Sequence, residues 1–389
     1  MQITELLLRY DTLLTRINDL RKKKFTTEEL KKLLFLMEYK YKYYELFPEG
    51  LNFLESFYLW LRNFTNLEEI EIATHLIWNL IYFSQKEIKY LSELLYREKI
   101  KKYILSKIIR DNNLKKYDYK SAYQKYWSSY ISRIIFIALS DGAMIDYFRR
   151  VNHIDNNNII TYYKLHPDEQ KRISNSSYKY YFLIEDFVGT GTTFLRDENN
   201  IQYWLKDGNI SKSNHLDLPN KDYKPDGALL KFIKFWNLIQ KENYNVIFCP
   251  YIITKFARRR LNSMIKFYGE KGFIPNYKNI TILPSYTIPD EARVIKDENS
   301  KIKIRKWDID NFDFDGIKRL CDNYYDKFIP DDHIKRGGGC IYGFGNRGLA
   351  VIKYNNTPNN TIYLIWHNDN NWHPLFFRNK RHEAIERGI

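Results

Sequence analysis

Two adjacent carboxylates followed by a loop of glycines and threonines are the residues of this sequence best suited to chemistry. Residues 181–184 form a short apolar run, Glu185 and Asp186 follow it directly, and residues 189–193 read Gly-Thr-Gly-Thr-Thr. The apolar run predicts a buried strand that delivers both carboxylates to its carboxyl end, before the chain turns into a helix. In an open α/β sheet, this edge is where ligands bind.

The loop after the carboxylates has the composition of a site for a single phosphate group. Gly189 and Gly191 permit positive φ angles and a close approach of the backbone to a ligand. The other expected donors are the amides of residues 189–193, the N-terminus of the following helix, and the hydroxyls of Thr190, Thr192 and Thr193. We expect these groups to converge on a dianionic phosphate.

Glu185 and Asp186 are expected to contact a different part of the same ligand. Carboxylates repel a phosphate, but as acceptor-only groups they suit the vicinal 2′ and 3′ hydroxyls of a ribose, and they can share a Mg²⁺ ion. The acidic pair and the loop together describe a ribose 5-phosphate. The alternative is an ordinary strand-to-helix turn whose acidic residues cap the helix.

This stretch resembles the phosphoribosyl-pyrophosphate-binding loop of type I phosphoribosyltransferases, in which an acidic pair precedes a Gly/Thr phosphate loop. A Walker A loop would end in Gly-Lys-Ser/Thr, which is absent here, and the GxGxxG pattern is not matched either. The resemblance implies a doubly wound, mainly parallel α/β sheet, phosphoribosyl pyrophosphate or a ribonucleotide as ligand, and Mg²⁺ as cofactor. It also implies that Glu185 and Asp186 form the catalytic pair, which stabilises positive charge at the ribose C1 and holds the metal.

A second loop is expected after the apolar run 134–139. It consists of Ser140, Asp141, Gly142 and Ala143, and a helix is expected to follow it. Its position is similar to that of the short loop that receives pyrophosphate in type I phosphoribosyltransferases, so the amides around Gly142 are expected to bind that anion. The Asp141 carboxylate opposes pyrophosphate unless it holds Mg²⁺ or caps the helix, and the cap is the favoured role.

Two pairs of arginines are candidates for additional anion contacts. Arg149 and Arg150 lie two turns along the helix expected after the second loop. Arg258 and Arg259 belong to a run of three arginines that follows the apolar strand near residue 250. Three adjacent arginines on a helix point over most of its circumference, so only one or two of the run 258–260 can face a site. Solvated positions are the alternative for all four candidates.

The sequence leaves the acceptor open. Purine-salvage members of the family carry an aspartate, thought to handle the base proton, at the position of Gly189, so the glycine puts purine salvage in doubt. A base, a nucleotide, a nucleic-acid end and a protein side chain all remain candidates for the nucleophile. A non-catalytic sensor of phosphoribosyl pyrophosphate or a nucleotide is the alternative to an enzyme.

The elements that position these residues follow an N-terminal helical segment. Apolar residues recur at spacings of three and four from Leu6 to Leu20, and Thr26, Thr65 and Ser84 each have a glutamate three residues on, as in a capping box. These patterns predict a helical bundle domain of residues 1–125.

Short apolar runs then alternate with helix-like stretches, which predicts a doubly wound sheet in a second domain of residues 126–389. The runs are 134–139, 159–163, 181–184, 246–249 and 280–283, and the helix-like stretches are 228–242 and 256–267. The polar residues 197–224 indicate an insertion or flap in this domain.

The C-terminal part is expected to add strands within residues 349–366, at 349–354 and 362–366, joined by a hairpin connection. The turn at 357–361, the run after it and the stretch 372–378 resemble a variant of the fold associated with bacterial conflict and anti-phage defence systems. This resemblance implies a toxic effector that acts during phage infection.

Composition favours a cytoplasmic globular protein without a membrane segment. Hydrophobic residues make up 44% of the chain and charged residues 28%, and no apolar run approaches the roughly 18 residues of a membrane span. Cys249, Cys321 and Cys340 are widely separated and form no CxxC pair. This spacing disfavours a disulfide framework and a zinc site, and it fits a reducing compartment.

The net charge of +15 is the one feature that favours nucleic acid. Residues 1–125 carry a net +6 and the other 264 residues a net +9, so the excess looks spread along the chain. A nucleic-acid or protein partner within a defence complex such as a retron remains an alternative. It would use Lys22 to Lys24, Lys99, Lys101, Lys102 and the arginine run 258–260.

Overall fold

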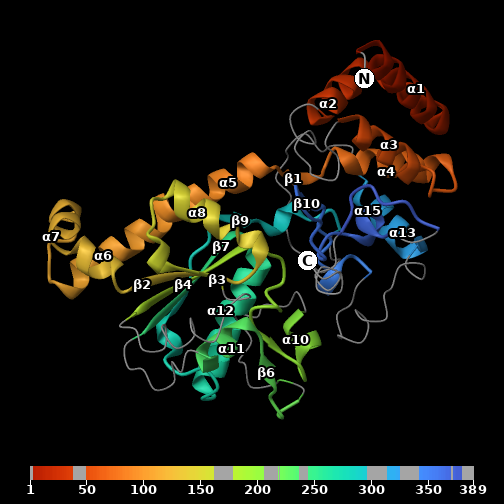
Figure 1. Ribbon diagram of the computed structural model, residues 1–389. Coiled ribbons are helices and arrows are strands. Elements are labelled where there is room, and N and C mark those ends of the chain that lie inside the picture. Colours follow the sequence, from red (N-terminus) through yellow and green to blue (C-terminus); the bar gives the residue numbers. More distant parts are fainter. Residues whose placement is uncertain are drawn as a thin grey trace, which may run out of the picture. The chain divides into compact units, whose positions relative to one another are not determined.

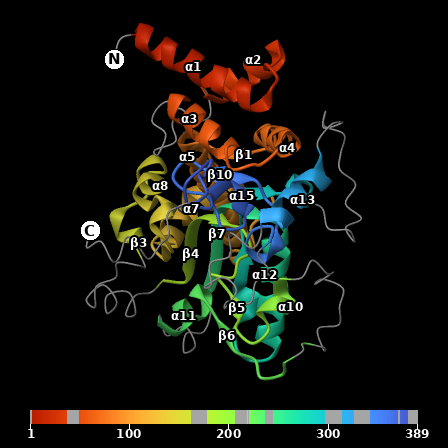
Figure 2. The same cartoon turned by 90° about the vertical axis from the view of Figure 1, so that its right-hand side faces the viewer.

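The chain folds into two compact units. The computed structural model describes residues 3–37, 50–161, 178–205, 218, 220–235, 244–295, 313–324, 341–368 and 371–378. Unit 1 comprises Met1–Glu87 and Asp290–Ile389, and unit 2 comprises Ile88–Pro289. Figures 1 and 2 show the elements of each unit in two views.

Unit 2 is built on a parallel sheet. Its strands are β2 (Ile134–Ala138), β3 (Ile159–Thr161), β4 (Tyr180–Val188), β7 (Asn245–Thr254), β8 (Ile280–Ile282) and β9 (Tyr286–Ile288). The order is β3-β2-β4-β7-β8, with β9 also paired to β7, and every one of these pairings is parallel. The predicted mainly parallel sheet is therefore confirmed.

Helices cover both faces of this sheet (Figure 1). They are α5 (Gln85–Leu94), α6 (Lys101–Asp111), α8 (Ile145–Val151), α11 (Ala228–Phe235) and α12 (Lys255–Glu270), while α7 (Tyr119–Ile131) packs against α6. On one face, Phe136 of β2 makes ring contacts with Tyr96 and with Phe148 of α8. On the other face, Tyr181 of β4 contacts Phe232 of α11. Because side chains alternate between the faces of a strand, buried runs such as 134–138 supply both layers, as a doubly wound sheet requires.

The predicted insertion is anchored by a buried aspartate where it begins. Strands β5 (Arg196–Asp197) and β6 (Pro225–Asp226) pair antiparallel at its two ends, and α10 (Ile201–Leu205) lies between them in sequence. The Asp197 carboxylate accepts hydrogen bonds from the Tyr268 hydroxyl at 2.5 Å, from Asn200 Nδ2 at 3.0 Å and from the Lys224 amide at 3.1 Å. Residues 206–217 and 219 lie outside the described residues.

Unit 1 combines N-terminal helices with C-terminal residues. Its elements are α1 (Ile3–Arg21), α2 (Thr27–Phe35), α3 (Gly50–Leu61), α4 (Leu67–Ile77), β1 (Ile81–Phe83), α13 (Phe314–Tyr324), β10 (Val351–Lys353) and α15 (Tyr363–Trp366). Strands β1 and β10 pair in parallel, and the indole N–H of Trp60 donates to the Leu364 carbonyl at 2.6 Å. These contacts tie the two ends of the sequence into one unit.

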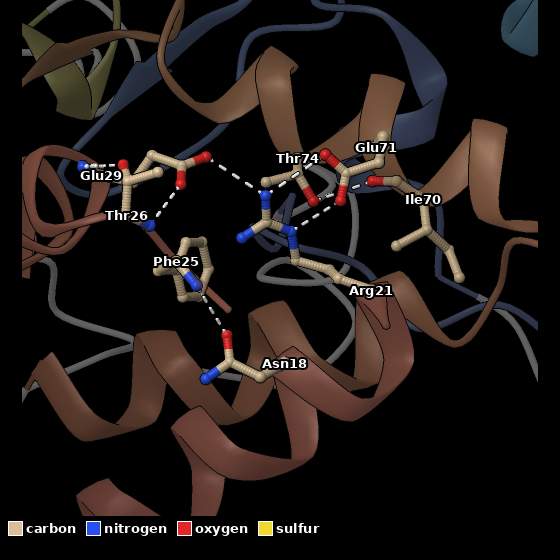
Figure 3. Close-up of polar contacts among 8 residues, drawn as sticks. All are labelled: Asn18, Arg21, Phe25, Thr26, Glu29, Ile70, Glu71 and Thr74. Atoms are coloured by element: carbon tan, nitrogen blue, oxygen red, sulfur yellow. Dashed lines mark hydrogen bonds and ion pairs between the residues drawn. The ribbon is translucent and has the colours of Figure 1, made fainter. Parts of the chain in front are cut away.

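A buried arginine links three of the N-terminal helices (Figure 3). Arg21, at the end of α1, donates from Nε to Glu71 Oε1 of α4 at 2.9 Å and from Nη2 to Glu29 Oε1 of α2 at 3.2 Å. Its guanidinium also lies over the Phe25 ring, 4.2 Å from the centroid. Glu29 in turn closes the capping box with Thr26, which confirms the predicted start of α2.

Of the other two predicted capping boxes, one forms as predicted and the other is shifted by one residue. Ser84 and Glu87 bond reciprocally and open α5, as predicted. The box predicted at Thr65 was wrong by one residue, because the Asn66 side chain caps α4 by accepting from the Glu69 amide. Glu69 bonds back to the Thr65 amide at 2.9 Å, so the glutamate that matters is Glu69 rather than Glu68.

The C-terminal strand prediction was half wrong. Residues 351–353 form β10, but residues 363–366 form helix α15 instead of a strand. Thr361 lies beside Leu349 in a parallel bridge, and the Ile362 amide donates to the Leu349 carbonyl. This parallel course rules out the antiparallel return of a hairpin at 362–366.

The division into units differs from the predicted boundary between residues 125 and 126. Tyr103 of α6 packs edge-on against Phe182 of β4, so this helix belongs with the sheet. The C-terminal residues instead pack with α3, as the stacked rings of Phe53 and Phe376 show. Among the described residues no helix has the length and apolarity needed to cross a membrane.

Candidate functional site

Glu185 and Asp186 lie within β4, because this strand continues to Val188. The pairing of β4 with β7 extends to Val188 opposite Ile253, whereas β2 pairs with β4 only as far as Ala138 opposite Ile184. The two carboxylates therefore lie just past the carboxyl end of β2, which no longer pairs with β4 there, while β7 still does. Both are buried, with exposed fractions of 8% and 4%.

The loop that follows β2 occupies the space beside these carboxylates. The hydroxyl of Ser140 donates to Glu185 Oε1 at 2.5 Å. Gly142 lies so close to the other acid that a Cβ atom added to it would be 2.5 Å from Asp186 Oδ2. The structure thus brings together the acidic pair and the loop 140–143, which are about 45 residues apart in the sequence.

Within this loop, Asp141 has a local role that differs from the predicted one. Its carboxylate accepts from the Gly142 amide at 2.9 Å, inside the 3-10 turn Asp141–Ala143, and α8 starts later, after Met144, with no side-chain cap. Asp141 therefore binds the amide of its own loop and does not cap α8. The Tyr251 hydroxyl holds the loop from β7 by donating to the Ala143 carbonyl at 2.5 Å.

The loop 189–193 forms a tight turn at the end of β4. Gly191 has a φ of +77°, and a Cβ atom there would lie 2.8 Å from the Leu261 side chain, so this position requires glycine. The hydroxyls of Thr190 and Thr192 approach each other to 3.1 Å, and Thr193 is exposed. Gly189 also lies in this turn, and its carbonyl accepts from the Thr254 hydroxyl at 2.5 Å.

The helix predicted after this loop does not form. The Phe194 and Leu195 amides both donate to the Gly191 carbonyl, and the chain then enters β5 at Arg196. Positive φ at Gly191 and pairing of residues 193–194 with the amides of residues 228–229 divert the backbone from a helical course. The expected contribution of a helix N-terminus to phosphate binding is therefore lost.

Arg260 supports the same loop from behind. It is fully buried on α12, and its guanidinium donates to the carbonyls of Thr190 and Leu195, each at 3.0 Å. Burial lowers the pKa of Arg260 to about 9, which still leaves it charged at neutral pH. Arg260 therefore positions the loop and does not present its charge to solvent.

The four arginines proposed as anion contacts lie on two helices. Arg149 and Arg150 are in the last turn of α8, half-buried and exposed respectively. Arg258 and Arg259 are exposed in the first half of α12, which begins directly after the carboxyl end of β7. Both helices start at the carboxyl edge of the parallel sheet, but Arg149 and Arg150 lie at the far end of α8, whereas Arg258 and Arg259 lie near the start of α12.

Sequence reasoning overlooked Thr254, Tyr251 and Arg260 as supports of the two loops. Thr254 could have been identified as a helix cap, since it precedes α12 and its hydroxyl accepts from the Ala257 amide at 3.0 Å. Arg260 lies four residues after Phe256 and four before Met264, both buried, and this spacing places it on the apolar face of α12.

A family comparison covers most of the chain. The PRTase-CE family model matches residues 59–378, which include both loops and the acidic pair. Searches of the curated proteins and of the solved structures found no match. On the strength of a match over more than half its length, the chain belongs to the PRTase-CE family, a phosphoribosyltransferase-like family.

Proposed function

We propose that unit 2 binds phosphoribosyl pyrophosphate with Mg²⁺ and transfers its ribose 5-phosphate to an acceptor. The observation that carries this proposal is the meeting of Glu185, Asp186 and the loops 140–143 and 189–193 at one edge of a parallel sheet. This is the edge at which α/β proteins of this type bind ligands. Membership in a phosphoribosyltransferase-like family supports the same reaction class.

The acidic pair would hold the ribose. Both carboxylates accept hydrogen bonds only, which suits the 2′ and 3′ hydroxyls, and the Ser140 hydroxyl fixes one oxygen of Glu185. In the transfer, the bond from C1 to pyrophosphate breaks and a bond from C1 to the acceptor forms. Pyrophosphate leaves with the electron pair, and the acceptor gives up a proton. Two fixed negative charges beside the ring stabilise the positive charge that develops at C1.

The loop 189–193 would bind the 5-phosphate through its own amides and hydroxyls. With no helix starting there, the phosphate depends on donors such as the Thr190, Thr192 and Thr193 hydroxyls. Arg260 and Thr254 hold three carbonyls of residues 189–195, so this turn keeps its shape without the ligand. A fixed turn reduces the ordering cost of binding.

Loop 140–143 would receive the pyrophosphate. The Gly142 amide is bound by the Asp141 carboxylate, and this carboxylate must move aside before the amide can donate to an anion. Asp141 is exposed, which leaves it room to do so. The Gly142 amide can therefore bind the anion only after the Asp141 carboxylate has released it.

Mg²⁺ fits this site as a cofactor that arrives with the substrate. Among the described residues there is no group of three or more His, Cys, Asp or Glu side chains that could hold a metal by itself. Mg²⁺ is commonly bound by one or two carboxylates together with substrate oxygens, and Glu185 and Asp186 would supply the protein's share. The ion would neutralise charge on the departing pyrophosphate.

The biological role that we propose is a toxic effector of a cytoplasmic anti-phage defence system. It rests on the resemblance of the C-terminal residues 357–366 and 372–378 to the conflict-associated variant of the fold. Expression with and without phage challenge would test it, with the Asp186→Asn variant as the inactive form. Equal growth of cells that produce either form, with and without phage, would contradict the effector role.

Release of pyrophosphate tests the enzymatic proposal. The full chain is incubated with phosphoribosyl pyrophosphate, Mg²⁺ and a panel of bases, nucleotides, nucleic-acid ends and proteins, and pyrophosphate is measured. We expect the wild type to release pyrophosphate and the Asp186→Asn variant to release none above background. The circular dichroism spectrum of the variant should match that of the wild type. Tight binding without release for any acceptor would favour a sensor, and full activity of Asp186→Asn would contradict the mechanism.

A further inference from the structure

Helix α7 is rich in aromatic side chains yet buries almost none of them. Five of its thirteen residues are aromatic, and Ala122 is the one residue of this helix that is buried. Tyr119 and Tyr123 are 44% and 46% exposed, and Tyr117, just before the helix, is 78% exposed. Aromatic side chains usually account for much of the buried area of a core or an interface, so their exposure here marks a binding surface.

The same segment is strongly basic. Residues 99–133 contain two acidic residues, Asp111 and Asp118, against ten basic ones: Lys99, Lys101, Lys102, Lys107, Arg110, Lys115, Lys116, Lys120, Lys125 and Arg133. Eight of the fifteen net positive charges of the chain therefore lie within 35 residues. Residues 1–98 carry 14 basic and 15 acidic residues, a net −1, so the positive charge of the first 125 residues lies in this segment and a count over 1–125 hides it.

The two acidic residues of the segment also hold its structure together. Asp111 accepts from the Tyr130 hydroxyl at 3.0 Å and ties α7 to α6. Asp118 caps α7 by accepting from the Ser121 amide at 3.1 Å. Both carboxylates keep their negative charge in these bonds and are already counted in the net +8. Just outside the segment, Glu98 pairs with Lys102 at 2.7 Å, and the excess of positive charge lies on the other basic residues.

Lysines and rings are interleaved on this surface. Lys101 of α6 places its Nζ 4.8 Å from the centroid of the Tyr123 ring and 5.8 Å from that of Trp127. The two rings are 5.2 Å apart and tilted by 34°. Figure 1 shows α7 beside α6 at one end of unit 2. We call the following residues the basic aromatic surface: Lys101, Lys116, Lys120, Tyr123, Lys125 and Trp127.

We propose that the basic aromatic surface binds a single strand of nucleic acid. Lysines neutralise phosphates, and exposed rings offer flat faces on which unpaired bases stack, the combination used by proteins that bind single strands. In a duplex the bases stack on each other, so they are not free to stack on the Tyr123 and Trp127 rings. A second copy of the chain would place one basic segment against another, and an acidic protein would satisfy the lysines but not the rings. This proposal stands apart from the phosphoribosyl site, because it uses none of its residues.

Fluorescence anisotropy with a labelled 20-nucleotide thymidine oligomer tests the proposal on the full chain. We expect the wild type to bind this single strand more tightly than the corresponding duplex. Because each stacked base contributes about 1–3 kcal/mol, loss of both rings in Tyr123→Ala/Trp127→Ala should weaken binding by about thirtyfold or more. Lys116→Gln/Lys120→Gln/Lys125→Gln should lower the slope of log K against log salt by about two, at about 0.7 per phosphate contact.

Tyr90→Ala/Lys266→Gln is the matched control, since it removes an exposed ring and an exposed lysine elsewhere in unit 2. Its affinity should equal that of the wild type. All variants should keep their circular dichroism and melting temperature, because none of the substituted side chains is buried. Failure of the wild type to bind at low salt, or equal loss in the control, would overturn the proposal. The proposal would also be overturned if the ring substitutions left oligomer binding unchanged but altered self-association in sedimentation. The same holds if they left oligomer binding unchanged but abolished the capture of a protein partner that nuclease treatment does not release.

Discussion

Gly142 and Asp186 lie so close together that a single added methyl group would collide with the carboxylate: a Cβ atom on Gly142 would be 2.5 Å from Asp186 Oδ2. The loop after β2 and the acidic pair in β4 are therefore fitted to each other without spare room. Glycine at this position lets the backbone approach the carboxylate.

The first prediction follows from this contact. Gly142→Ala should displace either the Asp186 carboxylate or the loop, and we expect pyrophosphate release to fall by at least about tenfold, since misplacement of a catalytic group by an ångström can cost about a hundredfold. Steady-state rates measured on folded protein check it.

Gly272→Ala serves as the control for that substitution. Gly272 has a φ of +83° and open space around it, so alanine there should reduce stability by about 1 kcal/mol through backbone strain alone. Its turnover should equal that of the wild type. Wild-type turnover in Gly142→Ala as well would show that the close contact with Asp186 is not needed.

The second prediction concerns the support of the phosphate loop by Arg260. Arg260→Met should leave the Thr190 and Leu195 carbonyls without their buried donors and lower the free energy of unfolding by about 2 kcal/mol. It should also weaken binding of phosphoribosyl pyrophosphate, because Thr190 belongs to the proposed phosphate site. Urea unfolding and calorimetry measure the two effects.

Arg258→Met provides the comparison, since Arg258 is exposed on the same helix two residues earlier. We expect it to change the free energy of unfolding by less than about 0.5 kcal/mol. If the two variants proved equally stable, the role of Arg260 as the internal support of the loop would be wrong.

The third prediction is a pH dependence in unit 1. Burial of the Glu29 carboxyl would raise its pKa, but the hydrogen bond from the Thr26 amide and the nearby Arg21 guanidinium hold this pKa below its usual value. Glu29 in Figure 3 lies between these two partners. Because the folded-state pKa is lowered, its stabilisation is present above the unfolded-state pKa of about 4.3 and is lost as the pH falls through the folded-state value.

Urea unfolding of the wild type and of Glu29→Gln between pH 7 and pH 3 measures this effect. The wild type should be more stable at pH 7, and the difference between the two proteins should shrink toward pH 3. A difference that stays constant across this range would mean that the charge of Glu29 contributes nothing.

The sequence allowed the sheet and the acidic pair to be predicted because buried parallel strands are continuous apolar runs. Residues 134–138 are fully buried and form β2, as their composition indicates. The same rule underestimated the length of β4, because its last residues include Glu185 and Asp186 and two carboxylates interrupt the apolar run. The extension is set by pairing with β7, which no local pattern reveals.

Tertiary contacts decided the features that the sequence did not reveal. The expected helix after Thr193 is replaced by a turn whose carbonyls bond to Arg260, a residue 70 positions away from Thr190. The segment after Thr361 does not return along β10 as a hairpin, because Thr361 pairs in parallel with Leu349, and residues 363–366 form a helix instead. A one-residue shift of the cap from Thr65 to Asn66 shows how similar polar residues compete at a helix start.

Isothermal titration calorimetry with phosphoribosyl pyrophosphate, with and without Mg²⁺, tests the central claim most directly. We predict one ligand per chain, tighter binding with Mg²⁺, and loss of affinity by about tenfold or more in Glu185→Gln/Asp186→Asn, since hydrogen bonds to charged groups contribute about 1.5–3 kcal/mol each. No heat of binding for the wild type, or undiminished affinity in the folded double variant, would contradict the assignment of this site to a ribose 5-phosphate.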